Sequence, residues 1–325
     1  MGAGSVGLVV GARLARAGED VLFVTRGPEA ALRIESEGVR IRYPSTGESW
    51  RTRARAVTAD RVGAEDVQRG PLLFCVRSAH TEAAARALAR SAPAATAVSM
   101  QNDVDNEARL AQHFGRVIGV AVRQTCTRTA LNEAVSLVGG RLAIGAHPEG
   151  GGEDVEQLAG RLRAAGYDVG ASQRIAEDKW LKLCVNLTSA PNALIRRVDH
   201  TAPEFVEIKV RLLEEAKAAL EAAGVTARSC DGRDRSLDDE IAHHRESLAL
   251  GSSARHLPVY NQVWSALRHG GPVEADAYHR RILDLAAAHR QSAPVNERVL
   301  AALERAVSEG LGPESLGAAQ ILAEA

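Results

Sequence analysis

Aromatic residues are scarce in this chain, and so are cysteines. Phe, Trp and Tyr together make up only 3% of the 325 residues, which argues against a surface that binds nucleic acid by stacking bases. The four cysteines lie far apart and form no C-x-x-C pair: Cys75, Cys126, Cys184 and Cys230. Their spacing fits a reducing compartment and argues against a disulfide framework or a zinc site.

Long apolar runs and an excess of charge are also missing. No stretch of about 18 apolar residues marks a membrane helix, and no basic-then-apolar leader opens the sequence. The formal net charge is −1, so the chain lacks a strong electrostatic pull toward nucleic acid. His243 and His244 are adjacent and so lack the i, i+4 spacing of helical metal ligands. We therefore expect a soluble cytoplasmic protein without a metal, acting on a small molecule rather than on nucleic acid or a membrane.

The first half of the chain alternates short apolar runs with helical patterns. Strands are expected at 21–24, 72–76, 97–100 and 117–122, with helices near 81–90 and 104–113. This alternation predicts a parallel, doubly wound sheet. A hairpin is then expected from 133–138 and 141–145 around Gly139-Gly140, followed by a helix over 153–165 and a closing strand at 167–169.

The second half has no convincing strands. Long helical patterns occupy residues near 178–190, 203–223, 274–291 and 294–308. The change from mixed to helical patterns predicts a dinucleotide-binding domain over residues 1–174. An all-α domain for substrate binding and dimerisation is expected over 175–325.

Three glycines open the chain in the stretch MGAGSVG, with the spacing G-x-G-x-x-G. A helical pattern follows and ends at Gly18, as in turns that place a dinucleotide pyrophosphate on a helix N-terminus. The residues expected to contact the cofactor are Gly2, Gly4, Ser5, Val6 and Gly7. Such a turn usually follows a buried strand, but only Met1 precedes it here. We therefore expect a Rossmann-like sheet whose first strand is truncated, and about five to eight further apolar residues upstream in the natural product.

The end of the expected strand 21–24 indicates which cofactor binds. An NAD site normally offers Asp or Glu there to the ribose 2′-hydroxyl, whereas this chain offers Thr25 and Arg26. Arg26 can pair bidentately with a 2′-phosphate, and Thr25 can donate its hydroxyl. These residues favour NADPH over NADH. The alternative is that Arg26 is a solvated charge in the turn before Gly27-Pro28.

The next two expected strands end in Val76-Arg77-Ser78 and in Met100-Gln101-Asn102. Carboxyl ends of parallel strands border the ligand crevice of such a sheet. Arg77 can there reach the cofactor or a substrate carboxylate, and Asn102 can hold an amide or a carbonyl. An exposed Arg that opens a helix and an ordinary loop Asn are the alternatives.

The helical pattern near 178–190 places Lys182, Asn186 and Ala190 at i, i+4 and i+8, on one stripe. Reduction of a ketone needs a hydride at carbon and a proton at the developing alkoxide. A protonated Lys182 can stabilise that oxygen and deliver the proton. The alternative is a solvated lysine on an amphipathic helix.

Four segments together resemble the ketopantoate reductase family. They are the glycine turn, Val-Arg-Ser at 76–78, Met-Gln-Asn at 100–102, and Trp-Leu-Lys-Leu-Cys-Val-Asn-Leu-Thr-Ser-Ala-Pro at 180–191. The resemblance runs over nearly the whole chain and includes 270–276 and 293–296. Members of this family reduce a 2-oxo acid with NADPH, and the resemblance implies the same class of reaction here.

By position, the resemblance also implies roles for single residues. Lys182 is the implied general acid, and Asn102 and Asn186 would orient the substrate or the nicotinamide. Glu274 would bind a substrate hydroxyl or support Lys182. Arg77 stands where the family has Lys, which keeps the charge but changes its geometry.

Three positions depart from the family pattern. Asp103 replaces a Gly, and Ala190 replaces an Asn. Gln262 stands where an ungapped count back from Glu274 places the family's substrate-binding Ser. Because sites that hydrogen-bond their substrate discriminate strongly against misfits, we predict that catalysis is kept and that the substrate has drifted from ketopantoate.

Two other functions stay open at this point. One is an NADPH-binding sensor without turnover, which Ala190 and Gln262 favour; the other is a reductase of imines. The retained Lys182, Asn186 and Glu274 favour a reductase of a 2-oxo acid or related ketone. The long helices of the second half would also allow a homodimer, although their patterns suit an internal core equally.

Overall fold

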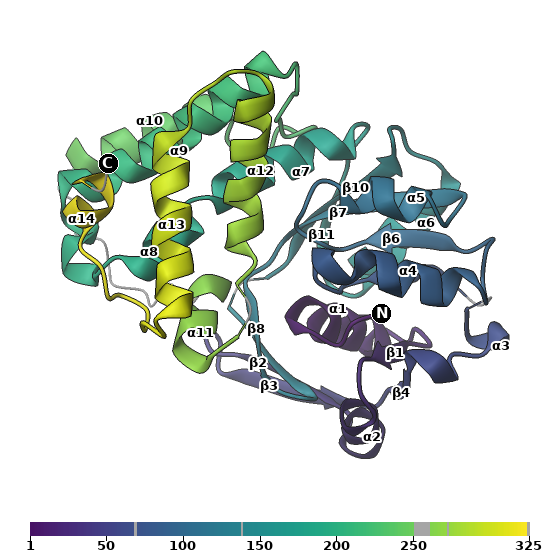
Figure 1. The fold of residues 1–325 in the computed structure, drawn as a ribbon. Helices are drawn as coiled ribbons and strands as arrows, with labels where there is room; N and C mark the ends of the chain where they lie inside the picture. The colour runs from purple at the N-terminus through teal and green to yellow at the C-terminus, as the bar shows by residue number, and fades with distance from the viewer. Residues whose placement is uncertain (68–69, 138, 250–260, 272, 324–325) are drawn as a thin grey trace. The chain divides into compact units, whose positions relative to one another are not determined.

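The computed structural model describes residues 1–67, 70–137, 139–249, 261–271 and 273–323 (Figure 1). The chain divides into two compact units, Met1–Lys179 and Trp180–Ala325. Strands and helices alternate in the first unit, and the described part of the second is helical apart from one bridge between Ile195 and Leu316. The predicted fold class, an α/β domain followed by an all-α domain, is confirmed. The division falls inside one helix, α7 (Ile175–Asn186).

The main sheet of the first unit has the strand order β11-β10-β7-β6-β5. Its strands are β5 (Leu72–Phe74), β6 (Thr96–Ser99), β7 (Arg116–Arg123), β10 (Arg141–His147) and β11 (Asp168–Ala171). β5, β6 and β7 are parallel, as predicted, whereas β10 runs antiparallel to β7. The expected runs therefore form strands, but the sheet is mixed rather than purely parallel.

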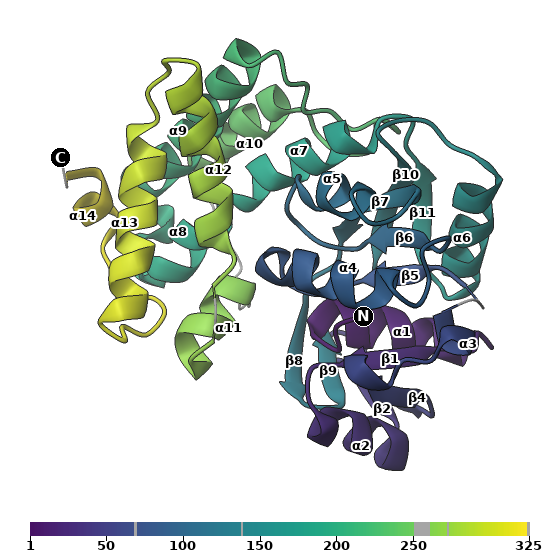
Figure 2. The same cartoon turned by 45° about the vertical axis from the view of Figure 1, so that its right-hand side comes forward.

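Helices cover both faces of this sheet (Figure 2). Ile118, Val120 and Val122 of β7 pack with α1 (Ser5–Arg16) and α6 (Glu153–Ala164). Val117 points to the other face and packs with α4 (Thr81–Ala89) and α5 (Asn106–Ala111). The run of apolar residues in β7 thus serves both faces, because successive side chains of a strand point in opposite directions.

A short parallel pair lies beside the main sheet: β1 (Leu22–Thr25) and β4 (Arg55–Thr58), covered by α2 (Pro28–Glu37). The first residues of the chain lie between β1 and β5. The Gly2 N–H donates to Val24 O (2.9 Å), the Cys75 N–H donates to Met1 O (2.8 Å), and the Met1 ammonium donates to Leu73 O (2.7 Å). Burial lowers the pKa of that ammonium below its usual value.

A second sheet, with the order β3-β2-β9-β8, was not predicted, although its strand β9 lies within the expected strand 133–138. Its strands are β2 (Val39–Tyr43), β3 (Glu48–Thr52), β8 (Cys126–Ala130) and β9 (Glu133–Ser136). The predicted hairpin is wrong, because β9 pairs with β2 and β8 whereas β10 pairs with β7 and β11. β10 is buried on both faces and β9 on one, so each joins the sheet that matches its pattern. Residue 138 of that prediction lies outside the described residues.

The second unit is built around α9 (Pro203–Ala222), whose buried face includes Leu212, Leu213 and Ala216. Packed against it are α8 (Ser189–Leu194), α10 (Leu237–Ala249), α12 (Ala275–Ala288), α13 (Pro294–Ser308) and α14 (Ala318–Ala323). Another helix, α11 (Gln262–His269), packs on α8. Among the described residues, no helix combines the length and the hydropathy needed to span a bilayer.

The helix predicted over 178–190 is interrupted. α7 ends at Asn186 and α8 begins at Ser189, so Ala190 does not continue the stripe of Lys182 and Asn186. The Thr188 hydroxyl donates to Val185 O (2.9 Å), and the Ser189 hydroxyl donates to Asn186 O. These side chains compete for carbonyls that a continuous helix would use, and Pro191 has no N–H to offer.

Candidate active site

The glycine turn lies at the carboxyl ends of β1 and β5. Gly2 has φ +96°, and a Cβ added to it would lie 2.9 Å from the Val76 backbone nitrogen. A Cβ on Gly7 would lie 2.0 Å from Gly2 O, so the turn closes only with glycine at this position. A Cβ on Gly4 meets no atom closer than Cys75 O at 4.0 Å.

The N-terminus of α1 follows this turn. Its N-cap is Gly4, no side chain caps the helix, and no acidic residue occupies its first turn. The first backbone N–H groups of a helix have no intrahelical acceptor, so those of Ser5, Val6 and Gly7 suit an anion. The Ser5 Oγ accepts a hydrogen bond from the Arg128 N–H (3.0 Å), and an Arg128 guanidinium nitrogen lies 3.5 Å from Ala3 O. Arg128, on β8, is a cation near the turn that the sequence did not indicate.

Two predicted cationic residues follow β1 and β5. Arg26 is exposed, and Arg77 is half-buried with an Nη2 that lies 3.2 Å from His80 Nε2. Burial, and then the charges of Arg26 and Arg77, lower the pKa of His80. Thr25 is buried, and its hydroxyl donates to Gly27 O (2.9 Å). The Thr25 side chain thus stabilises the turn that contains Arg26.

A buried polar network fixes the loops after β5 and β6. The Gln101 Nε2 donates to Val76 O (2.9 Å) and to Thr81 Oγ1 (2.6 Å). The Thr81 hydroxyl in turn donates to Asn106 Oδ1 (2.7 Å). Asn102, the predicted binding residue, follows this network directly and is half-buried. Asp103 is not among the residues with positive φ, so the replacement of the family's Gly introduces no backbone strain.

A buried ion pair lies beneath the same strand end. Lys179 Nζ contacts Glu107 Oε1, and it also donates to Ser99 Oγ at 3.2 Å. The side chains of Lys179 and Glu107 are 1% and 3% exposed. The pair joins the start of α7 to α5 and β6 within the first unit. Sequence reasoning missed it because Lys179 lies only three residues before the predicted acid and forms no recognisable motif.

Apart from Asn102, the predicted substrate-side residues lie in the second unit. Lys182 is buried in the middle of α7, and Asn186 is the last residue of that helix. Glu274 is the half-buried N-cap residue of α12. Gln262 is exposed, whereas its neighbour Asn261 caps α11 by accepting from the Trp264 N–H (2.8 Å) and donates to Ser189 O (2.7 Å). Asn261, which the sequence did not single out, thus ties α11 to α8.

The segment 293–296 begins α13 and contributes to a buried network. The Asn296 Oδ1 accepts from His279 Nδ1 of α12 (3.0 Å), and Glu215 of α9 accepts from the backbone N–H groups of Val295 and Asn296 (2.9 Å each). The His279 Nε2 has no partner among the described residues. Burial lowers the pKa of His279 to about 4, because a second proton would place an unpaired charge in the helical core.

The buried His279 should make the stability of the second unit sensitive to acid. Its pKa is about 4 when folded and about 6.5 when unfolded, so the unfolded chain binds more protons between these values. The contribution of His279 to stability is complete above pH 6.5 and falls by about 1.4 kcal/mol per pH unit between there and its folded pKa of about 4, below which it no longer changes. We expect His279→Asn to flatten the pH dependence of urea unfolding by that slope. His289→Asn, an exposed histidine at the end of the same helix, should keep the wild-type slope; equal slopes for both variants would contradict the assignment.

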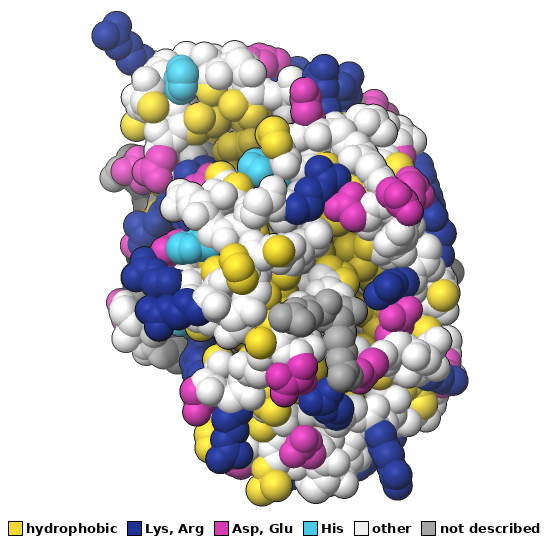
Figure 3. Space-filling view, turned by 90° about the vertical axis from the view of Figure 1, so that its right-hand side faces the viewer, with side chains coloured by type: hydrophobic (Ala, Val, Ile, Leu, Met, Phe, Trp, Pro, Cys, Tyr) yellow, Lys and Arg dark blue, Asp and Glu magenta, His cyan; other side chains and the backbone are white. Residues whose placement is uncertain are grey.

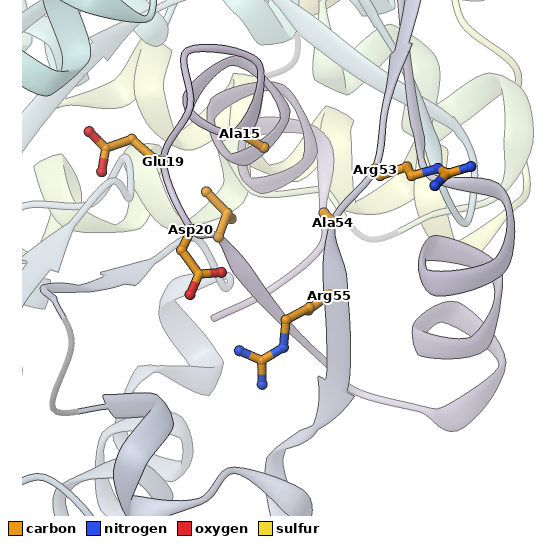
Figure 4. Close-up of a pocket in the computed structure, with 7 residues that line it drawn as sticks. Ala15, Glu19, Asp20, Arg53, Ala54 and Arg55 are labelled. Carbon is orange, nitrogen blue, oxygen red and sulfur yellow. The ribbon is translucent and has the colours of Figure 1, made fainter.

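A pocket of about 350 Å³ lies elsewhere, at the amino ends of β1 and β4 (Figure 4). Among its lining residues, Arg55 pairs with Asp66 (2.8 Å) and Glu19 pairs with Arg161 (3.5 Å). The glycine turn lies at the opposite ends of these strands, so this pocket is separate from the predicted cofactor site. On the face shown in Figure 3, cationic and anionic side chains are interspersed.

Two family models match this chain. The model of ketopantoate reductase PanE/ApbA matches residues 1–149, and the model of its C-terminal domain matches residues 174–306. A 2-dehydropantoate 2-reductase of Halobacterium salinarum is 25% identical over 311 residues, which cover 94% of this chain and 96% of that protein. One from Pyrococcus abyssi is 24% identical over 303 residues and covers 91% and 93%.

Solved structures agree with these matches. A PanE/ApbA family ketopantoate reductase from Ralstonia eutropha superposes with a TM-score of 0.76 at 26% identity, over 95% of this chain and 98% of that one. A D-mandelate dehydrogenase, solved with NADH and anilino(oxo)acetate, has a TM-score of 0.79 over 96% and 98%. Its 15% identity shows a shared fold alone. Because the two family models together span most of the sequence, the chain belongs to the ketopantoate reductase family.

Proposed function

We propose that this protein is an NADPH-dependent reductase of a 2-oxo acid or a related ketone. The observation that carries the proposal is that both family models match this chain. The resemblance further implies that Lys182 is the general acid and that Glu274 binds a substrate hydroxyl or supports Lys182. The related proteins named 2-dehydropantoate 2-reductase set the reaction class.

The residues present suit a phosphorylated dinucleotide. The uncapped N-terminus of α1 offers N–H groups to a pyrophosphate, and the close approach of Gly7 to Gly2 O shapes the turn that exposes them. Arg26, Arg77 and His80 place cationic and donor groups at the neighbouring strand ends. A 2′-phosphate needs such partners and an acidic residue there would repel it, so we propose NADPH rather than NADH.

Within this proposal the residues divide the work. When bound, the reduced nicotinamide supplies the hydride to the carbonyl carbon. Lys182 holds a proton close to the carbonyl oxygen, stabilises the negative charge that develops there, and transfers the proton to it. Asn102 and Asn186 orient the reacting groups by hydrogen bonds, and Glu274 binds a substrate hydroxyl or orients Lys182.

The substrate itself is proposed to differ from ketopantoate. Ala190 is fully buried in α8 and offers no side-chain hydrogen bond where the family has Asn, and the exposed Gln262 replaces the expected Ser. A polar group of the substrate that lacks a hydrogen-bond partner is still removed from water. This desolvation cost weakens binding of the transition state. A 2-oxo acid that lacks the hydroxyl of ketopantoate does not incur this loss.

NADPH oxidation by the purified protein with a panel of 2-oxo acids, ketones and cyclic imines tests the function. We expect turnover of at least one 2-oxo acid, with ketopantoate a poor substrate. Efficient reduction of ketopantoate would refute the proposal that the substrate differs from ketopantoate. Tight NADPH binding with no turnover of any compound would favour the sensor, and a preference for imines would favour the third function. Sedimentation equilibrium of the purified protein tests the predicted homodimer independently of the reaction.

The glycine turn predicts two separable defects. In Gly7→Ala, the new methyl collides with the Gly2 carbonyl, so we expect a lower Tm and a loss of NADPH binding of more than about tenfold. In Gly4→Ala, the methyl has space within the protein but obstructs a closely bound pyrophosphate, so Tm is kept and binding weakens. Thermal unfolding and fluorescence titration with NADPH measure both. Unchanged binding in Gly4→Ala would place the pyrophosphate elsewhere.

A further inference from the structure

His80 occupies an unusual position beside the proposed 2′-phosphate partners. It ends a single 3₁₀ turn, Ser78–His80, that follows β5, and its Nε2 lies 3.2 Å from Arg77 Nη2. Arg26, after β1, is close enough for its charge to act on the imidazole. Two guanidinium groups and one imidazole from two strand ends thus gather in the first unit.

The contact with Arg77 determines the protonation state of His80. A guanidinium has only donors, so the Arg77 N–H must donate and the His80 Nε2 must accept. The ring nitrogen therefore keeps its lone pair, and the imidazole is neutral. The same conclusion follows from the lowered pKa of His80, because burial and then the charges of Arg26 and Arg77 disfavour its protonation.

Other charged groups around this turn are already paired. On α4, Glu82 accepts from Arg86 (2.6 Å) and His113 (3.0 Å). On α5, Arg109 donates to Ser78 O (3.3 Å) and lies 3.7 Å from Asp105. Asp60, in the 3₁₀ turn that packs on α4, accepts a hydrogen bond from the Thr58 side chain and interacts with the charge of Arg61. Protonation of His80 therefore needs a new negative charge rather than one of these carboxylates.

We propose that His80 takes up a proton when the 2′-phosphate of NADPH binds beside Arg26 and Arg77. The phosphate accepts the Arg77 N–H, which frees the His80 Nε2 lone pair. A dianion then offsets the guanidinium charges, and the imidazole gains a proton that it donates to a phosphate oxygen. This inference rests on the proposed preference for NADPH, and it makes His80 a pH-dependent specificity residue.

The sign of the linkage follows directly. Uptake of a proton on binding means that NADPH binds more tightly as pH falls, until the free His80 is itself protonated. At pH 7.5 the free phosphate is dianionic, since its second pKa is about 6, and His80 is neutral. We expect uptake of about half a proton per NADPH at this pH, and affinity about tenfold tighter at pH 6.5 than at pH 8.5.

Calorimetric titration of the full chain at pH 7.5, in HEPES, PIPES and Tris buffers, measures the uptake from the buffer dependence of the binding enthalpy. Binding of NADPH to the wild type should be accompanied by proton uptake, and binding of NADH should not. His80→Gln keeps an acceptor for Arg77 but cannot be protonated, so we expect NADPH to bind without uptake. His113→Gln, which removes the histidine paired with Glu82, is the matched control and should keep the wild-type value.

Each outcome decides a different point. Uptake that persists in His80→Gln assigns the proton to another group, such as the buried Met1 ammonium, and overturns the inference. Tighter binding of NADPH than NADH without uptake also overturns it but leaves the proposed cofactor intact. Equal affinity for NADPH and NADH contradicts the proposed cofactor itself.

Discussion

Lys182→Met should lower kcat, measured with the best substrate of the panel described above, by about 10²- to 10⁴-fold, the usual contribution of a general acid. Met keeps the length of the buried side chain but removes its charge and its proton. The NADPH dissociation constant should change by less than about threefold, because the glycine turn, Arg26 and Arg77 are untouched. Steady-state kinetics and NADPH titration on the same preparation measure both quantities.

Two further variants sharpen this test. Lys182→Arg restores a positive charge but holds its proton too tightly to release it, so kcat should recover by less than about tenfold. Lys217→Met removes a half-buried lysine of α9 that pairs with Asp238, outside the proposed site, and it should leave kcat unchanged. A Lys182→Met protein that keeps more than a tenth of the wild-type kcat would refute Lys182 as the acid.

Much of the fold could be predicted because the strongest sequence signals are local. The apolar run 117–122 lies within β7, and the pattern at 294–308 matches α13. Both segments are long and periodic, so packing and propensity agree on them. The second sheet could not be predicted because it depends on the pairing of β2 with β9. These strands are about ninety residues apart in the sequence, and no local pattern encodes which strands pair.

The interruption of α7 shows a different limit. Trp180, Leu183 and Cys184 have helical spacing and lie within α7, which ends at Asn186, one residue before Leu187. The break depends on side-chain hydroxyls at Thr188 and Ser189 that take carbonyls from the last turn. Such competition depends on side-chain rotamers rather than on the hydrophobic pattern. A prediction from hydrophobic periodicity alone therefore makes the helix too long.

The buried pair of Lys179 and Glu107 also lay beyond sequence reasoning, and it carries the second large prediction. Lys179→Met leaves the Glu107 carboxylate buried without a cation, and breaking such a pair destabilises a protein by about 3–5 kcal/mol. Urea unfolding of the variant measures this loss. Lys179→Met combined with Glu107→Gln removes both charges, so most of the lost stability should return.

The double variant also separates a structural role from a positioning role. The pair holds the start of α7 against β6, and Lys182 lies one turn further along the same helix. If the pair positions that helix, the double variant stays folded and binds NADPH normally but loses about tenfold in kcat. Arg86→Met with Glu82→Gln, an exposed pair on α4, is the matched control and should change neither stability nor kcat by a comparable amount. Full kcat in the double variant would instead show that the Lys179–Glu107 pair contributes to stability and does not position α7 for the reaction.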